Sequence, residues 1–303
     1  MRLADVFLVV FSWLTLGTLR AEVVQESAPT GIVVQVDIPY VDEGSTNDYV
    51  REQCKLDLYL PRNVDKPFPI LVWFHGGGLQ GGSKTNALTA KLAMHLALKG
   101  VGVAIPEYRF SPKVTFPAYV EDAANSVRWV VDHASEFGAA TNVFVGGHSA
   151  GGYLTSLLAM DPRYFAAVGV STNNIAGYIP MSGQTMTHFA VAIERGLGVN
   201  AITADDAAPI SHLASVTPPI LLLIGDKDWP ARLQENQYFV AALQQVGHNP
   251  NVCLIVAKDR NHGSILKESS VEGDPVGVAM LDFIRSGQLP KPAEELPAPD
   301  EGK

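Results

Sequence analysis

Cysteine is nearly absent from the 303-residue chain, which contains only Cys54 and Cys253. A dense disulfide framework is therefore excluded, and apolar packing must supply the stability, as the 47% hydrophobic content allows. We expect even this pair to remain unbridged, because the strands near the two residues are predicted at opposite edges of a sheet. A disulfide needs Cα atoms within about 7 Å of each other.

Clusters of basic residues are also missing. The formal net charge is −9, and no group of Lys and Arg could build the basic face of a nucleic-acid binder. Neither H-E-x-x-H nor C-x-x-C occurs, and the glycines of residues 76–82 lack the spacing of a dinucleotide fingerprint. We therefore expect no metal, no organic cofactor and no nucleic-acid partner.

Long apolar runs are rare, and the one near the start, residues 6–16, is too short to span a bilayer. Arg2 precedes this run, and small or polar residues follow it up to Ala21. This pattern predicts a signal peptide over residues 1–21, with cleavage near Ala21 and export to the periplasm or medium. Stable membrane insertion is not expected. Residues 286–303 are rich in Pro, Glu and Lys, which predicts a disordered tail.

Between these ends, strand-like and helix-like segments alternate. Short apolar runs predict buried strands, and segments of helical periodicity separate them. The predicted strands include residues 70–74, 101–105, 143–145, 166–170, 220–224 and 252–256. Such alternation implies an α/β fold with a mostly parallel sheet and helices on both faces. Functional side chains are then expected on loops at the carboxyl ends of the strands.

The loop after residues 143–145 contains G-H-S-A-G at residues 147–151, which fits the G-x-S-x-G pattern. A strand precedes this segment and a helix is predicted after it, so the serine lies on a sharp turn that exposes its hydroxyl. Ser149 is therefore the predicted nucleophile. The alternative interpretation is a glycine-rich turn with an unreactive serine.

The loop after residues 70–74 reads H-G-G-G at residues 75–78. Consecutive glycines let backbone amides approach a ligand closely, as the stabilisation of a tetrahedral oxyanion requires. We predict an oxyanion hole formed by the amides of Gly77, Gly78 and Ala150. This segment differs from a phosphate-binding P-loop, because no G-K-[S/T] follows it. His75 is expected to be a structural loop residue.

A serine nucleophile needs a base, and the base needs a carboxylate that fixes its orientation. His262 lies in the loop after the last predicted strand, downstream of an acidic loop. Two carboxylates in that loop are candidates, Asp228 first and Asp226 second. The order serine, acid, histidine along the chain is that of α/β-hydrolases.

Several segments together resemble the hormone-sensitive-lipase-like and BD-FAE esterases of the α/β-hydrolase superfamily, from about Cys54 to Arg285. They are HGGG at 75–78, EYRFSP at 107–112, FPAYVEDAANSVRWV at 116–130, GHSAGG at 147–152 and PPILLLIGDKD at 218–228. The resemblance implies an α/β-hydrolase domain over residues 22–285, with about eight strands and a small cap insertion near residues 172–216. It assigns nucleophile, acid and base to Ser149, Asp228 and His262.

Two positions depart from the family pattern: Leu79 stands where an aromatic residue is frequent, and Glu107 where Asn is frequent. The segment 177–191 resembles a pocket-lining segment of the family. Its candidate wall residues are Met181, Met186, His188 and Phe189, although core packing explains each of them equally well.

The predicted function is that of a carboxylesterase that cleaves small to medium esters through an acyl-enzyme. These small-molecule esters are the expected substrates. The same side chains could serve an arylformamidase or a carbohydrate acetyl esterase. A non-catalytic binding protein with this fold is disfavoured, because such proteins lose a member of the triad. A haloalkane dehalogenase is excluded, because its nucleophile is a carboxylate.

Overall fold

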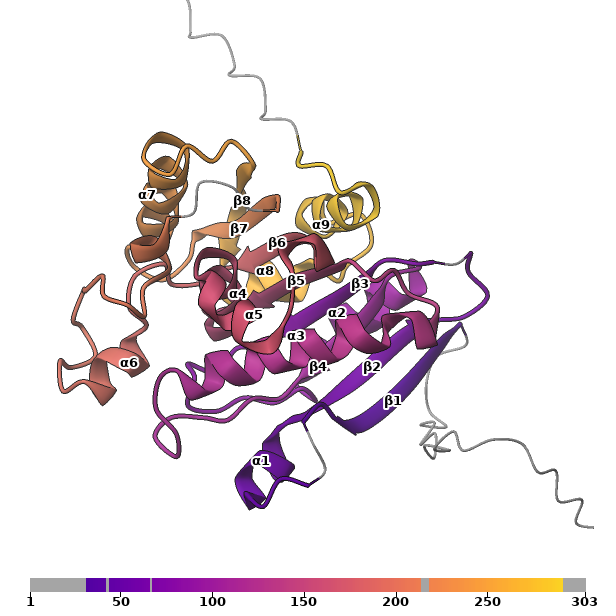
Figure 1. Ribbon diagram of the computed structural model, residues 1–303. Helices are drawn as coiled ribbons and strands as arrows, with labels where there is room; N and C mark the ends of the chain where they lie inside the picture. The colour runs from indigo at the N-terminus through magenta and orange to yellow at the C-terminus, as the bar shows by residue number, and fades with distance from the viewer. Residues whose placement is uncertain (1–30, 42–43, 66, 214–217, 291–303) are drawn as a thin grey trace, which may run out of the picture.

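A computed structural model describes residues 31–41, 44–65, 67–213 and 218–290 (Figure 1). The predicted signal peptide lies outside these residues, and so does the predicted tail beyond residue 290. Among the described residues, no helix is both long enough and apolar enough to cross a membrane.

The centre of the fold is an open sheet of eight strands in the order β1-β2-β4-β3-β5-β6-β7-β8. The strands are β1 (Ile32–Pro39), β2 (Lys55–Pro61), β3 (Ile70–Phe74), β4 (Gly102–Pro106), β5 (Val143–His148), β6 (Ile175–Met181), β7 (Ile220–Lys227) and β8 (Val252–Asn261). Strand β2 pairs antiparallel with β1 and β4, and all later neighbours are parallel. This confirms the α/β-hydrolase fold predicted from the sequence.

Helices cover both faces of the sheet (Figure 1). One face carries α3 (Ala118–Phe137), α4 (Ala150–Met160) and α7 (Arg232–Gln245), and the other carries α2 (Ala87–Leu98), α8 (Ser264–Glu268) and α9 (Pro275–Ser286). Side chains of β3 alternate between these layers, since Val72 faces the first and Trp73 the second. Burial on both faces explains why the central strands are continuous apolar runs.

The predicted strand at residues 166–170 is wrong, because residues 166–168 form the end of α5 (Pro162–Val168) and the two residues after them lie in no strand. The Asp161 side chain accepts the amide of Arg163 as an N-cap, Pro162 occupies the first turn, and Gly169 ends the helix in the left-handed conformation. These local signals outweigh the apolar run. The next strand is β6, so the range 172–216 assigned to a cap begins too early and includes a core strand.

The segment after β6 contains α6 (Phe189–Glu194), which stands at the side of the molecule (Figure 1). The remaining short helix, α1 (Asp48–Gln53), precedes β2. Both cysteines are free, as expected, because Cys54 directly precedes β2 and Cys253 lies on the edge strand β8.

The direction of the sheet order reverses at β3, which lies between β4 and β5. Such a reversal splays the loops that follow the two adjacent strands and opens a crevice at their carboxyl ends. The H-G-G-G segment leaves β3 at this point, and Ser149 leaves β5 beside it.

Candidate active site

Ser149 lies on the turn between β5 and α4, with φ of 59° and ψ of −115°. A positive φ is rare for a residue with a side chain, and such strain persists only where the surrounding structure enforces it. The serine amide donates to the carbonyl of Met181 on β6 at 2.9 Å, and the serine carbonyl accepts from Tyr153 at 3.0 Å. These bonds fix the turn from both sides.

Two glycines make this turn sterically feasible. A Cβ on Gly151 would lie 2.0 Å from the carbonyl oxygen of Phe74, at the end of β3. A Cβ on Gly147 would lie 2.6 Å from the carbonyl group of Gly151. Both distances are below any van der Waals contact, so the glycines of the G-x-S-x-G pattern let helix α4 pack directly against β3.

The structure brings Ser149, His262 and Asp228 together, although they come from three separate strand ends. Nε2 of His262 is 2.9 Å from Oγ of Ser149, and Nδ1 is 2.8 Å from Oδ1 of Asp228. A carboxylate accepts, so the imidazole proton lies on Nδ1 and Nε2 is left to take the serine proton. Strand β8 extends to Asn261, so His262 directly follows it, without the short loop expected from the sequence.

The Asp228 carboxylate is completely buried and receives three donors. Ser182 donates its hydroxyl to Oδ2 at 2.6 Å, and the amide of Trp229 donates to Oδ1 at 2.6 Å, beside the bond from His262. Burial alone would raise the pKa of Asp228, but the hydrogen bonds from His262 and Ser182 lower it below its usual value. The side chain therefore stays ionised at neutral pH.

Asp226, the second candidate acid, does not contact His262. Its Oδ1 accepts the amide of Arg260 at 3.2 Å, so it helps to join the ends of β7 and β8. Asp228, and not Asp226, is therefore the carboxylate that bonds His262.

The sequence interpretation missed three residues that hold these groups in place. The indole of Trp229 stacks on the His262 imidazole, with ring centroids 3.6 Å apart and an interplanar angle of 16°. Nε2 of His148 donates to the backbone carbonyl of His262 at 2.7 Å, and burial lowers the pKa of His148 to about 4. The third is Ser182, which directly follows β6. Strand β6 was not predicted from the sequence. With that strand in place, the position of Ser182 directly after it would have indicated a site residue.

The H-G-G-G loop lines the same cavity as Ser149 and His262. Gly77 and Gly78 have φ of 137° and 66°, values that residues with side chains rarely adopt. Within the described part of the chain, no acceptor bonds the amide of either glycine, nor that of Ala150 in the first turn of α4. These are the three amides predicted for an oxyanion hole, and they remain free to donate.

A cavity of about 380 Å³ lies beside these groups. Its lining residues, which come from strand ends, from the glycine loop and from the starts of helices, are His75–Gly78, Gly82, Asn86, Leu88, Thr89, His148, Ser149, Trp229, His262, Gly263 and Leu266. The cavity is small and has a reactive hydroxyl on its wall, which suits a compact acyl or alcohol group.

None of the four candidate wall residues from segment 177–191 belongs to this lining. Met181 lies in β6 and packs in the core, and His188 is buried as the N-cap of α6. Phe189 comes closest, because its ring tip would lie 2.8 Å from a Cβ placed on Gly78. It therefore packs behind the glycine loop, whereas core packing accounts for Met181 and His188.

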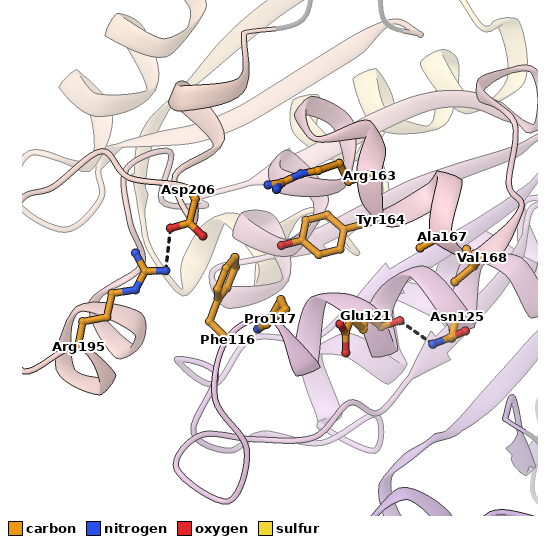
Figure 2. Close-up of a pocket in the computed structure, with 10 residues that line it drawn as sticks. All are labelled: Phe116, Pro117, Glu121, Asn125, Arg163, Tyr164, Ala167, Val168, Arg195 and Asp206. Atoms are coloured by element: carbon orange, nitrogen blue, oxygen red, sulfur yellow. Dashed lines mark hydrogen bonds and ion pairs between the residues drawn. The ribbon is translucent and has the colours of Figure 1, made fainter.

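Figure 2 shows a second cavity, of about 710 Å³, between α3, α5 and the segment that follows α6. The rings of Phe116 and Tyr164 and the ion pair of Arg195 with Asp206 line it. It contains none of the residues predicted for the site, so the reactive groups belong to the smaller cavity.

The proteins similar to this chain include esterases. Residues 56–195 match the BD-FAE family model. The chain is 28% identical over 289 residues to the "Probable carboxylic ester hydrolase LipM" of Mycobacterium tuberculosis, covering 86% of this chain and 64% of that protein. It is 27% identical to "Isoprenylcysteine alpha-carbonyl methylesterase ICME" of Arabidopsis thaliana, covering 72% and 56%. The chain thus spans about half to two thirds of the length of these curated relatives.

Solved structures show the same fold. An esterase B from "Lactobacillus Rhamnosis" superposes with a TM-score of 0.67 at 19% identity, covering 85% of this chain and 88% of that chain. A structure described as "Bacterial Heroin Esterase" gives a TM-score of 0.63 at 22% identity, covering 85% of each chain.

The close contact between α4 and β3 predicts the effect of adding one methyl group at the turn. Gly151→Ala should destabilise the protein by about 1–3 kcal/mol, because the methyl group would displace α4 from β3. Gly81→Ala is the matched control, since nothing lies within 4 Å of its Cβ position, and its effect should stay within about 0.5 kcal/mol. Urea unfolding measures both, and equal losses in the two variants would contradict the steric account.

Proposed function

We propose that this chain, which belongs to the α/β-hydrolase superfamily and within it to the hormone-sensitive-lipase-like and BD-FAE group, is a serine carboxylesterase. The observation that carries the proposal is the continuous hydrogen-bonded chain from Ser149 through His262 to Asp228, which faces unbonded amides. Its substrates are esters with a small to medium acyl group, in keeping with the volume of the reactive cavity.

The reaction begins when Ser149 attacks the ester carbonyl and His262 takes its proton through Nε2. Asp228 stabilises the imidazolium through the bond to Nδ1, and the amides of Gly77, Gly78 and Ala150 stabilise the oxyanion. His262 then returns the proton to the leaving alcohol. Water enters, loses a proton to the same imidazole and hydrolyses the acyl-enzyme, which restores the serine.

The role of His148 follows from its burial. Because its pKa is lowered to about 4, His148 is neutral at the pH where His262 must gain a proton. A second positive ring 4.8 Å away would oppose that protonation. A neutral His148 instead holds the backbone of residue 262 without this repulsion.

Export is a further part of the proposal. It rests on the apolar run and the small residues of segment 1–21. N-terminal sequencing of the protein recovered after expression in a bacterial host would test it, and an N-terminus near residue 22 is the expected result.

Replacement of the nucleophile tests the proposed activity. Ser149→Ala should lower kcat for p-nitrophenyl acetate by about 10⁶-fold, since the acyl-enzyme cannot form. The variant should keep the circular dichroism spectrum of the parent protein. Turnover comparable to that of the parent protein would rule out Ser149 as the nucleophile.

The two neighbouring aspartates offer a matched pair for identifying the acid. Asp228→Asn should lower kcat by about 10⁴-fold, because an amide can no longer hold the imidazole in its reactive tautomer. Asp226→Asn, two residues away and bonded to Arg260, should change kcat by about twofold or less. Steady-state kinetics on p-nitrophenyl acetate would disprove the assignment if the larger loss appeared at residue 226.

A further inference from the structure

One carboxylate closes the glycine loop of the candidate site. Oε2 of Glu107 lies 2.9 Å from Nε2 of His75, at the start of the loop. Oε1 accepts the hydroxyl of Ser83 at 2.9 Å and the amide of Lys84 at 2.8 Å, at the end of the loop. A single side chain therefore holds the two ends of the segment that runs from residue 75 to residues 83 and 84.

The carboxylate itself is held firmly, because Glu107 directly follows β4 in the sheet. Its amide donates to the carbonyl of Lys55 at 2.8 Å, and its carbonyl accepts the hydroxyl of Tyr40 at 2.7 Å. The sheet thus fixes the backbone of residue 107, and the side chain transmits this fixed position to the loop.

The loop needs such a restraint because its backbone is strained. Gly77, Gly78, Leu79 and Gly82 all have positive φ, and Leu79 has a side chain that makes this conformation costly. A Cβ on Gly82 would lie 2.2 Å from the carbonyl oxygen of Gly76, so the two ends of the loop also touch each other.

Charge explains why a carboxylate suits this position. Burial would raise the pKa of Glu107, but the bond from His75 and those from Lys84 and Ser83 lower it below its usual value. An ionised carboxylate has enough lone pairs for all three donors. The Lys84 ammonium does not neutralise it, because that group pairs with Asp37 and Asp57.

An amide would change the bonding at this position. With its single acceptor oxygen on Ser83 and Lys84, its NH₂ group would face Nε2 of His75, which would then have to accept, and the negative charge that strengthens all three bonds would be lost. Both ring nitrogens of His75 already face acceptors, since Nδ1 lies 2.7 Å from the carbonyl oxygen of Gly76. A carboxylate at residue 107 thus bonds both ends of the glycine loop through charge-assisted hydrogen bonds, which an amide cannot supply.

We propose that Glu107 is a positioning residue, which holds the amides of Gly77 and Gly78 where they bind the oxyanion of the transition state. This inference rests on the proposed esterase function and assigns the departure at residue 107 to transition-state stabilisation. It predicts that loss of the carboxylate lowers kcat and weakens the binding of transition-state analogues. Substrate binding should stay nearly unchanged.

The test compares Glu107→Gln with Asp274→Asn. Asp274 is a buried carboxylate that accepts two backbone amides at the start of α9. In the described part of the chain, its other side-chain partner is Arg260. Both variants are assayed with p-nitrophenyl acetate and with 2,2,2-trifluoroacetophenone, a ketone that forms a tetrahedral oxyanion adduct with a serine nucleophile.

For Glu107→Gln we expect kcat to fall by about 10–100-fold, somewhat less than the loss of one whole oxyanion donor. The inhibition constant of the ketone should rise by a similar factor, and KM should change by about threefold or less. Asp274→Asn should lower the urea midpoint but leave kcat and the inhibition constant unchanged.

Equal kinetic changes in the two variants would overturn the inference, and so would a Glu107→Gln protein that keeps its kcat and ketone affinity. Failure of the proposed function gives a different result, because the parent protein would then neither hydrolyse the ester nor bind the ketone.

If Glu107→Gln does not fold, a second variant tests the same inference. Ser83→Ala removes one of the three donors to Glu107, and the side chain it changes is partly exposed. It should lower kcat and raise the inhibition constant, as in Glu107→Gln, and an unchanged pair would contradict the inference.

Discussion

The close contact between the turn at Ser149 and the end of β3 is the constraint on which the rest of the site depends. Gly151 can lie against the carbonyl of Phe74 only because it has no side chain. This contact brings the loop after β3 beside the loop after β5, so that amides from both can face one point in space. A residue with a Cβ at position 151 would separate the nucleophile from the glycine loop by moving the helix.

Two carboxylates with little exposure stabilise this arrangement in the same way. Asp228 gathers donors from His262, Ser182 and Trp229, and Glu107 gathers donors from both ends of the glycine loop. In each case burial would raise the pKa, and the donors lower it instead. Each carboxylate therefore stays charged and orients the groups that bond it, which are the imidazole of His262 for Asp228 and the ends of the glycine loop for Glu107.

The sequence was most informative where local rules decide the structure. The apolar runs at residues 70–74 and 220–224 are strands, because burial on both faces of a parallel sheet demands such runs. The strained turn at Ser149 has its own sequence pattern, and the structure has that turn there. The predicted strand at 166–170 failed because a helix cap and a C-terminal glycine outweighed its apolar composition.

Contacts between distant segments could not be predicted in this way. Asp226 and Asp228 differ by two residues, and only the length of β7 decides which one reaches His262. The strand continues to Lys227, so Asp228 is the first residue beyond it. The stacking of Trp229 on His262 likewise depends on how two loops meet, which no local pattern of either loop encodes.

The central claim is that His262 activates Ser149 for attack on an electrophile, and covalent labelling tests it most directly. The protein is treated with diisopropyl fluorophosphate, and intact mass and peptide mapping then locate the adduct. The account predicts a single adduct on Ser149, with labelling at least about a hundredfold slower in a His262→Gln variant. No adduct, an adduct at another residue, or equally fast labelling of the variant would contradict it.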